Sequence, residues 1–124
     1  MIMLDTHVAV ALYDGRTGGL SAPARRAIDK DVVTISPAVL LEIELLFEIR
    51  RLREGAKVVA AGLSGDLDIR VAGERFADVA SEALALGFTR DPFDRLIVAH
   101  ASLSKATLVT QDATLRYRYP KSMS

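Results

Sequence analysis

Residues 2–13 read IMLDTHVAVALY and set a pattern that continues along the chain. Ile2 to Leu4 form a short apolar run that suits a buried strand, and Asp5 follows it directly. Residues 6–13 then have the composition of a helix, which is expected to end near Gly15. The beginning of the chain therefore predicts a strand, a carboxylate at its end, and a helix.

The same alternation of strand and helix extends to the C-terminus. Further strands are expected at residues 31–35, 67–71 and 106–109, and helices at residues 21–30, 37–53, 56–63, 73–86 and 92–104. Strands separated by helices favour a parallel sheet that is covered on both faces. We therefore predict an α/β fold, a three-layer α/β/α sandwich with a mostly parallel sheet of four or five strands.

The composition limits the kinds of function that are open to the chain. It has 124 residues, of which 50% are hydrophobic and 26% charged, so residues 1–124 are expected to form a single globular domain. The 16 basic and 16 acidic residues cancel, which gives no global positive charge for nucleic acid. With no cysteine and only two histidines, thiolate metal sites, disulfides and histidine-rich metal sites are excluded.

The sequence also carries expectations about location. No apolar run approaches the length that a membrane span needs, and the N-terminus lacks the basic segment of a signal peptide. We expect a cytoplasmic protein with no membrane partner, in which carboxylates perform most of any chemistry.

Two carboxylates follow strands of the predicted sheet. Asp5 comes directly after the first strand, and Asp112 follows the fourth strand by two residues. Because ligands of parallel sheets bind at the carboxyl ends of the strands, both side chains are expected at one edge of the sheet. This edge is the first candidate for a functional site.

A third carboxylate, Glu42, lies in an apolar stripe of the helix expected at residues 37–53. The residues three, four and seven positions away are Ala38, Val39, Leu45, Leu46 and Ile49. A charge in such surroundings is costly unless it is paired or holds a cation. The structural alternative is a position at the edge of the stripe or a pair with an arginine.

Asp91 and Asp94 lie one turn apart at the start of the helix expected at residues 92–104. Asp91 precedes Pro92 and is a natural N-cap. Asp94 takes the third helical position, where a carboxylate favours the helix dipole, so a purely structural role is an even alternative. The apolar residues that follow place this helix start near the edge of the sheet.

Asp5, Glu42, Asp94 and Asp112 thus form a set of four carboxylates, each at a strand end or near a helix start. Four like charges that converge without a counterion repel one another strongly. Mg²⁺ or Mn²⁺, which prefer oxygen ligands, would remove this repulsion. A metal ion held in this way activates water and stabilises charge on a phosphodiester, so the predicted chemistry is hydrolytic phosphoryl transfer.

Four segments carry a resemblance to a known family. They are MLDTH at residues 3–7, SPAVLLEI at residues 36–43, RDPFDRLIVA at residues 90–99 and LVTQD at residues 108–112. In this order they resemble the PIN-domain ribonucleases and, within them, the VapC-type toxins of toxin–antitoxin pairs. The third segment is the most specific, and the match covers nearly the whole chain. Leu41 departs from the pattern, because many relatives have tryptophan there; the change affects packing rather than chemistry.

The resemblance implies a PIN-like fold and an endoribonuclease that depends on Mg²⁺ or Mn²⁺. Carried over residue by residue, it makes Asp5, Glu42, Asp94 and Asp112 the catalytic and metal-binding set.

Four further residues are candidates for assisting this set. Asp91 would act through water or only cap its helix, and Arg95 would contact a carboxylate or phosphate or be an ordinary surface arginine. Thr6 would cap the first helix or contact the site. Thr110 would position a water or ligand, or be structural. His100, inside an apolar helix, is more typical of a core or interface residue.

The resemblance also implies three partners: an RNA substrate, a cognate antitoxin that covers the acidic site, and a second copy in a homodimer formed through helices. Basic residues cluster at 50–53 and at 116–121, the latter beside Tyr117 and Tyr119, and could contact phosphates and bases. The alternatives are a solvated helix end and a frayed terminus. The number of apolar residues near the end of this helix exceeds what one helix face buries, which favours a protein partner; they are Leu45, Leu46, Phe47 and Ile49.

Two other classes of function are compatible with a parallel α/β fold. A PIN-like binding or regulatory module without hydrolytic activity is disfavoured, because all four acids are present. A phosphatase or phospho-accepting domain would use Asp5 as nucleophile and would need further acidic residues nearby, but His7 stands where one such site needs an aspartate.

Overall fold

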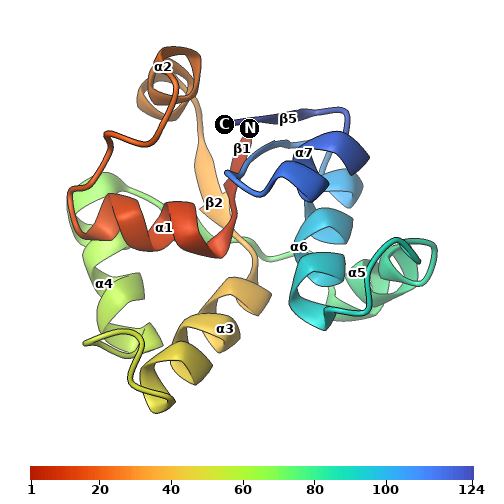
Figure 1. Cartoon of the computed structure of the whole chain (residues 1–124), viewed down its shortest axis with the longest axis horizontal. Coiled ribbons are helices and arrows are strands. Elements are labelled where there is room, and N and C mark those ends of the chain that lie inside the picture. The colour runs from red at the N-terminus through yellow and green to blue at the C-terminus, as the bar shows by residue number, and fades with distance from the viewer.

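A five-stranded sheet runs through the computed structural model, which describes residues 1–124 (Figure 1). Its strands are β1 (Ile2–Leu4), β2 (Val33–Ile35), β3 (Arg70–Val71), β4 (Thr107–Val109) and β5 (Ser122–Met123). The strand order is β3-β2-β1-β4-β5, and every neighbouring pair is parallel. The predicted α/β fold is therefore confirmed, with an all-parallel sheet.

Seven helices flank this sheet. They are α1 (Thr6–Tyr13), α2 (Ala22–Lys30), α3 (Pro37–Glu48), α4 (Ala56–Leu67), α5 (Phe76–Ala83), α6 (Pro92–Leu103) and α7 (Ala113–Arg118). Helices α1, α3 and α4 pack against one another, α5 packs on α6, and α3 also contacts α6. Figure 1 shows α1 and α4 on one side of the strands and α5 and α6 on the other. No helix is both long and apolar enough to cross a membrane.

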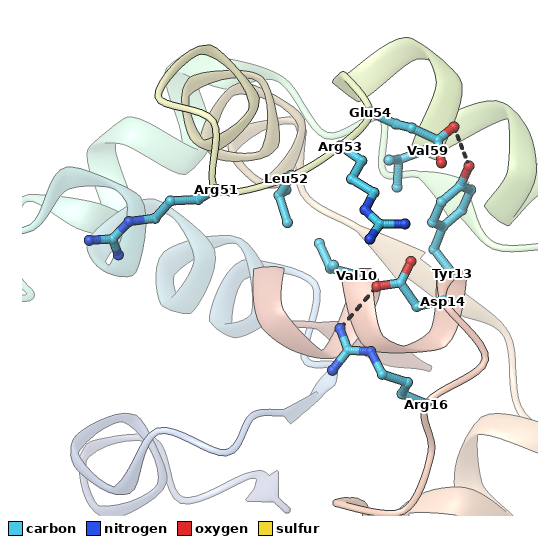
Figure 2. Close-up of a pocket in the computed structure, with 9 residues that line it drawn as sticks. All are labelled: Val10, Tyr13, Asp14, Arg16, Arg51, Leu52, Arg53, Glu54 and Val59. Carbon is cyan, nitrogen blue, oxygen red and sulfur yellow. Dashed lines mark hydrogen bonds and ion pairs between the residues drawn. The ribbon is translucent and has the colours of Figure 1, made fainter.

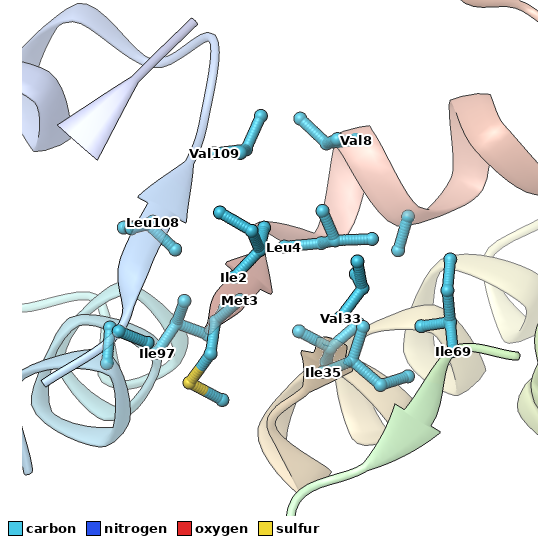
Figure 3. Packing of buried hydrophobic residues seen from close by; sticks show 14 of the residues in the cluster. Ile2, Met3, Leu4, Val8, Val33, Ile35, Ile69, Ile97, Leu108 and Val109 are labelled. Atoms are coloured by element: carbon cyan, nitrogen blue, oxygen red, sulfur yellow. The ribbon is translucent and has the colours of Figure 1, made fainter. Parts of the chain in front are cut away.

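The core is built on the central strands. Met3, Leu4 and Leu108 are completely buried, and Ile35 and Ile97 pack beside them (Figure 3). Each such side chain contributes about 1.5–3 kcal/mol through its removal from water. A sheet covered on both faces needs strands that are apolar throughout, which explains why β1 has no polar residue.

Several element boundaries differ from the prediction. The helix expected at residues 37–53 ends at Glu48, because Arg50 adopts a left-handed φ of 62° that cannot continue a helix. The helix expected at 56–63 continues to Leu67, where a left-handed Asp68 ends it. The strand expected at 67–71 is accordingly reduced to two residues. The helix expected at 73–86 spans only Phe76–Ala83.

The C-terminal segment is ordered, so the alternative of a frayed terminus is wrong. Residues 113–118 form α7, and Ser122–Met123 pair with β4 as the fifth strand. Tyr119 is buried, and its hydroxyl donates to the carbonyl of Ala106 at 2.6 Å. Its ring is therefore not free to stack on a base, whereas Tyr117 is 84% exposed.

Candidate functional site

A cavity of about 370 Å³ opens at the carboxyl ends of β1 and β4, and no hydrophobic residue lines it. Its lining consists of Asp5, His7, Glu42, Asp91, Asp94, Gln111 and Asp112. The four carboxylates predicted as the catalytic set, together with Asp91, are thus brought to one place from four separate segments of the chain.

Asp5 is held at the end of β1 by two hydrogen bonds. Its Oδ1 accepts from the backbone N–H of Thr6 at 2.8 Å, which caps α1, and its Oδ2 accepts from the hydroxyl of Thr110 at 2.6 Å. The side chain is only 7% exposed. The pairing of Leu4 with Val109 places Thr110 beside Asp5, so the β1–β4 register positions this carboxylate.

Glu42 projects from α3 toward α1, where its Oε1 accepts a hydrogen bond from the hydroxyl of Thr6. Burial raises the pKa of the Glu42 carboxyl. The hydrogen bond from Thr6 lowers this pKa, but the negative charges of Asp5 and Asp91 add to the rise, and the net shift is upward. A carboxylate in this position gains from a nearby positive charge.

Asp91 and Asp94 lie at the N-terminus of α6, as predicted. The Oδ1 of Asp91 accepts from the N–H groups of Phe93 and Asp94 at 2.9 and 3.3 Å, so Asp91 is the N-cap. Asp94 accepts no hydrogen bond from the chain and is half-buried. Burial, and then the charges of the four other acids, raise the pKa of Asp94 to about 7.

Asp112 is the N-cap of α7. Its Oδ1 accepts from the N–H groups of Thr114 and Leu115 at 2.8 and 3.0 Å. Its own N–H donates to the hydroxyl oxygen of Thr110 at 3.1 Å, so one hydroxyl group links the loop that carries Asp112 to Asp5.

Three helix N-termini therefore converge on the cavity. Asp5, Asp91 and Asp112 cap α1, α6 and α7, and each cap points the positive end of a helix dipole toward the acids. In Asp91 and Asp112 the capping oxygen is Oδ1, and Oδ2 accepts no hydrogen bond from the chain. The capping roles of Asp91 and Asp112 thus leave one carboxylate oxygen of each available to a ligand.

The remaining predicted residues divide into two groups. Thr6 and Thr110 contact the acids directly, as described. Arg95 does not line the cavity; its Nη2 donates to the carbonyl of Leu84 at 3.4 Å, and it forms no ion pair with a carboxylate. This placement agrees with the alternative of an ordinary surface arginine.

His100 is a satisfied core residue, as the sequence indicated. It is 1% exposed, and its Nδ1 lies 2.9 Å from the Ser36 hydroxyl while its Nε2 lies 3.1 Å from Glu74 Oε2. Ser36 caps α3, so this network joins the helix of Glu42 to the helix of Asp94. The hydrogen bond from His100 lowers the pKa of Glu74.

Sequence reasoning missed two lining residues, Gln111 and, as part of the cavity, His7. Each is within two residues of an acid of the site, and each is exposed. Their position beside Asp112 and Asp5 in the sequence was the only available signal, because neither residue type is distinctive at a strand end.

The donor set suits a hard divalent cation. Carboxylate oxygens are the ligands that Mg²⁺ and Mn²⁺ prefer, and the raised pKa values of Glu42 and Asp94 show that positive charge would be favourable here. No three of the His, Asp and Glu side chains lie close enough together to enclose an ion by themselves. Mg²⁺ usually keeps several waters and binds through one or two carboxylates, so an open polar cavity fits a hydrated ion.

The chain is similar to known proteins in both sequence and fold. The family model described as PIN domain matches residues 2–119. A chain from the crystal structure of VapBC2 from Rickettsia felis bound to a DNA fragment from their promoter superimposes with a TM-score of 0.63. The two are 21% identical, over 99% of this chain and 96% of that one, and the similarity shows a shared fold. None of the curated proteins matches the sequence. The family match over most of its length establishes that this chain belongs to the PIN domain family.

Proposed function

We propose that this chain is a metal-dependent endoribonuclease and acts as the VapC-type toxin of a toxin–antitoxin pair. One observation carries the proposal: five carboxylates line a single cavity with no apolar wall, at the strand ends of a PIN-family sheet. The fold shared with a chain of the VapBC2 structure and the DPFDR segment at residues 91–95 support the toxin assignment.

In this proposal Asp5, Glu42, Asp94 and Asp112 are the catalytic set and hold a hydrated Mg²⁺ or Mn²⁺, one or two of them directly and the others through its water molecules. A divalent cation bound there would lower the pKa of a water molecule and offset negative charge on the scissile phosphate. Asp91, whose Oδ2 is free, would hold a water molecule near the set.

Hydrogen bonds within the chain hold these carboxylates in position before a metal ion or substrate binds. The Thr110 hydroxyl keeps Asp5 from rotating, and the Thr6 hydroxyl keeps Glu42 directed at the cavity. Asp94 holds its proton up to about pH 7 without a cation, so displacement of that proton accompanies the binding of a metal ion. Metal binding and activity should therefore both strengthen as the pH rises through 7.

The direct test is RNA cleavage by purified protein without antitoxin, in Mg²⁺ or Mn²⁺ and in EDTA. Asp94→Asn should abolish the metal-dependent products. Asp78→Asn is the matched control, because Asp78 is the third residue of α5 as Asp94 is of α6, and its side chain is 57% exposed. Cleavage that persists in Asp94→Asn would refute the assignment, and metal binding without any cleavage would favour a binding module.

The proposal includes two protein partners. A cognate antitoxin would present a basic side chain to the carboxylates, and its addition should suppress cleavage in a stoichiometric manner. A second copy would cover the apolar side chains that α3 leaves in solvent: Leu41, Leu45 and Phe47 are 57%, 40% and 40% exposed. Light scattering on the purified chain would distinguish a dimer from a monomer.

A further inference from the structure

Three cavities adjoin α1 and are linked by shared lining residues. The first is the acidic cavity, and a second of about 250 Å³ shares Gln111 with it. The second also shares Arg16 with a third, of about 410 Å³, at the other end of the helix. The acidic cavity is therefore linked to the third cavity through Gln111, the second cavity and Arg16, and we refer to this row of neighbouring cavities as a groove. Helix α1, which the three cavities adjoin, is about 12 Å long, since eight helical residues rise 1.5 Å each.

The third cavity is rich in arginine. Arg16, Arg51 and Arg53 line it together with two carboxylates, Asp14 and Glu54. Figure 2 shows Arg53 and Arg16 on opposite sides of the Asp14 carboxylate, while Arg51, from the same loop as Arg53, extends outward. Arg16 pairs with Asp14 at 2.9 Å, and Arg51 and Arg53 form no ion pair. The guanidinium groups of these exposed residues keep free donors that suit phosphate oxygens.

The second cavity is bordered by the loop that contains Gly18 and Gly19. Gln111 Nε2 donates to the carbonyl of Gly19 at 2.6 Å, which fixes the loop beside the acidic cavity. Gly18 faces open space, because a Cβ placed there would meet nothing within 4 Å. The second cavity, which joins the acids to the arginines, is lined by Gly18, Gly19 and Ala11 besides Val8, Leu20, Gln111 and Arg16.

Electrostatic repulsion explains why RNA binding at the acidic cavity needs positive charge such as that of the arginine-lined third cavity. A cavity of five carboxylates repels a polyanion, and the chain as a whole has no net positive charge to compensate. Affinity for RNA comes chiefly from phosphate contacts with Lys and Arg. The positive charge that holds a substrate must therefore be local and must lie along a path open to the acids.

We propose that this groove, called here the α1 groove, binds the phosphodiester backbone of the RNA strand on one side of the cleaved bond. The strand runs from the acids past Gln111 and Gly18 to Arg16 and Arg53. This inference rests on the proposed ribonuclease function, and it assigns a substrate-binding role to arginines outside the acidic site.

The test measures binding of a short labelled single-stranded RNA by fluorescence anisotropy, with Asp94→Asn as the parent in Mg²⁺ so that the RNA stays intact. Adding Arg16→Ala and Arg53→Ala should reduce the slope of log K against log salt by about 1.4, since each phosphate contact on a single strand contributes about 0.7. At 0.1 M salt this corresponds to an affinity about 10- to 30-fold weaker. Arg25→Ala with Arg26→Ala, on the exposed face of α2, removes the same charge and should leave the slope nearly unchanged.

A second variant tests the path without removing an arginine. Gly18→Glu places a carboxylate in the groove where there is room for it, and should weaken RNA binding. Gly65→Glu, which is equally unobstructed but lies on α4, is the control. Equal RNA affinity of the groove variants and their controls would refute RNA binding in the α1 groove.

Cleavage kinetics separate this inference from the proposed function. In the otherwise native chain, Arg16→Ala with Arg53→Ala should raise KM and leave kcat nearly unchanged, because these residues bind the ground state and the transition state alike. Metal-dependent cleavage with an unaltered KM would support the ribonuclease function and refute RNA binding in the α1 groove. RNA binding that depends on these arginines, without any cleavage, would support RNA binding in the α1 groove and refute the ribonuclease function.

Discussion

Asp94→Asn should stabilise the protein in the absence of metal. The pKa of Asp94 rises from 3.8 to about 7 on folding, so above pH 7 the folded chain carries an ionised group that it disfavours. At 1.36 kcal/mol per pKa unit the full cost would be about 4 kcal/mol. The side chain is half-buried, and screening by water reduces the usable effect to about 1–2 kcal/mol. For a chain of this size, the expected rise in Tm is about 3–8 °C.

The direction of the pKa shift fixes how the stabilisation by Asp94→Asn depends on pH. Because the pKa of Asp94 is higher in the folded state than in the unfolded state, the native chain has its full stability below about pH 3.8. It loses part of that stability as the pH rises to about 7. The difference in Tm between Asp94→Asn and the native chain should therefore be largest near pH 8. Near pH 5 it should be less than half as large, since only about one pKa unit of the shift is then expressed.

Thermal unfolding in EDTA, followed by circular dichroism at about pH 5 and pH 8, measures the effect. Asp78→Asn serves as the control at the equivalent helix position and should leave Tm unchanged or slightly lower, because it loses only a favourable dipole contact and a 4.0 Å pair with Arg75. A gain of the same size at both pH values, or the same gain in Asp78→Asn, would show that carboxylate repulsion is not its origin.

Three further outcomes are expected. Mg²⁺ or Mn²⁺ should raise the Tm of the native chain progressively, by the equivalent of about 2.7 kcal/mol at a concentration 100 times Kd, and should affect Asp94→Asn less; a flat titration would contradict metal binding. Thr110→Val removes the 2.6 Å hydrogen bond to Asp5 at a fully buried position, and should weaken metal affinity about 10- to 100-fold in a calorimetric titration while the fold survives. Ser36→Ala loses the cap of α3 and the hydrogen bond to buried His100, which should cost about 2–4 kcal/mol in urea unfolding; a loss below about 0.5 kcal/mol would show that the network is dispensable.

The placement of the acids could be predicted because it depends on local sequence and on one rule of topology. Asp5 and Asp112 follow apolar strands, and carboxyl ends of parallel strands meet at one edge. Glu42 was identified by its apolar helical neighbours, and burial does raise its pKa. These signals are visible in the sequence because each requires only the spacing of residues along one element.

Other features depend on contacts between distant segments and leave no local trace. The double hydrogen bonding of Thr110 follows from the register of β1 on β4, which sequence spacing does not reveal. The strand at Ser122–Met123 is too short for an alternating pattern and exists because β4 offers it a pairing edge. The end of α3 depends on a left-handed Arg50, where no glycine marks the turn.

The strand order also governs when the acidic cavity can exist during synthesis. β1 lies between β2 and β4, and Ile2 pairs with Thr107, which is made more than a hundred residues later. At about 5–20 residues per second, the ribosome needs about 5–20 s to join these partners. Asp112 is made later still, so a chain released before that residue lacks at least one of the acids of the cavity. The topology thus postpones the assembly of the site until translation is nearly complete.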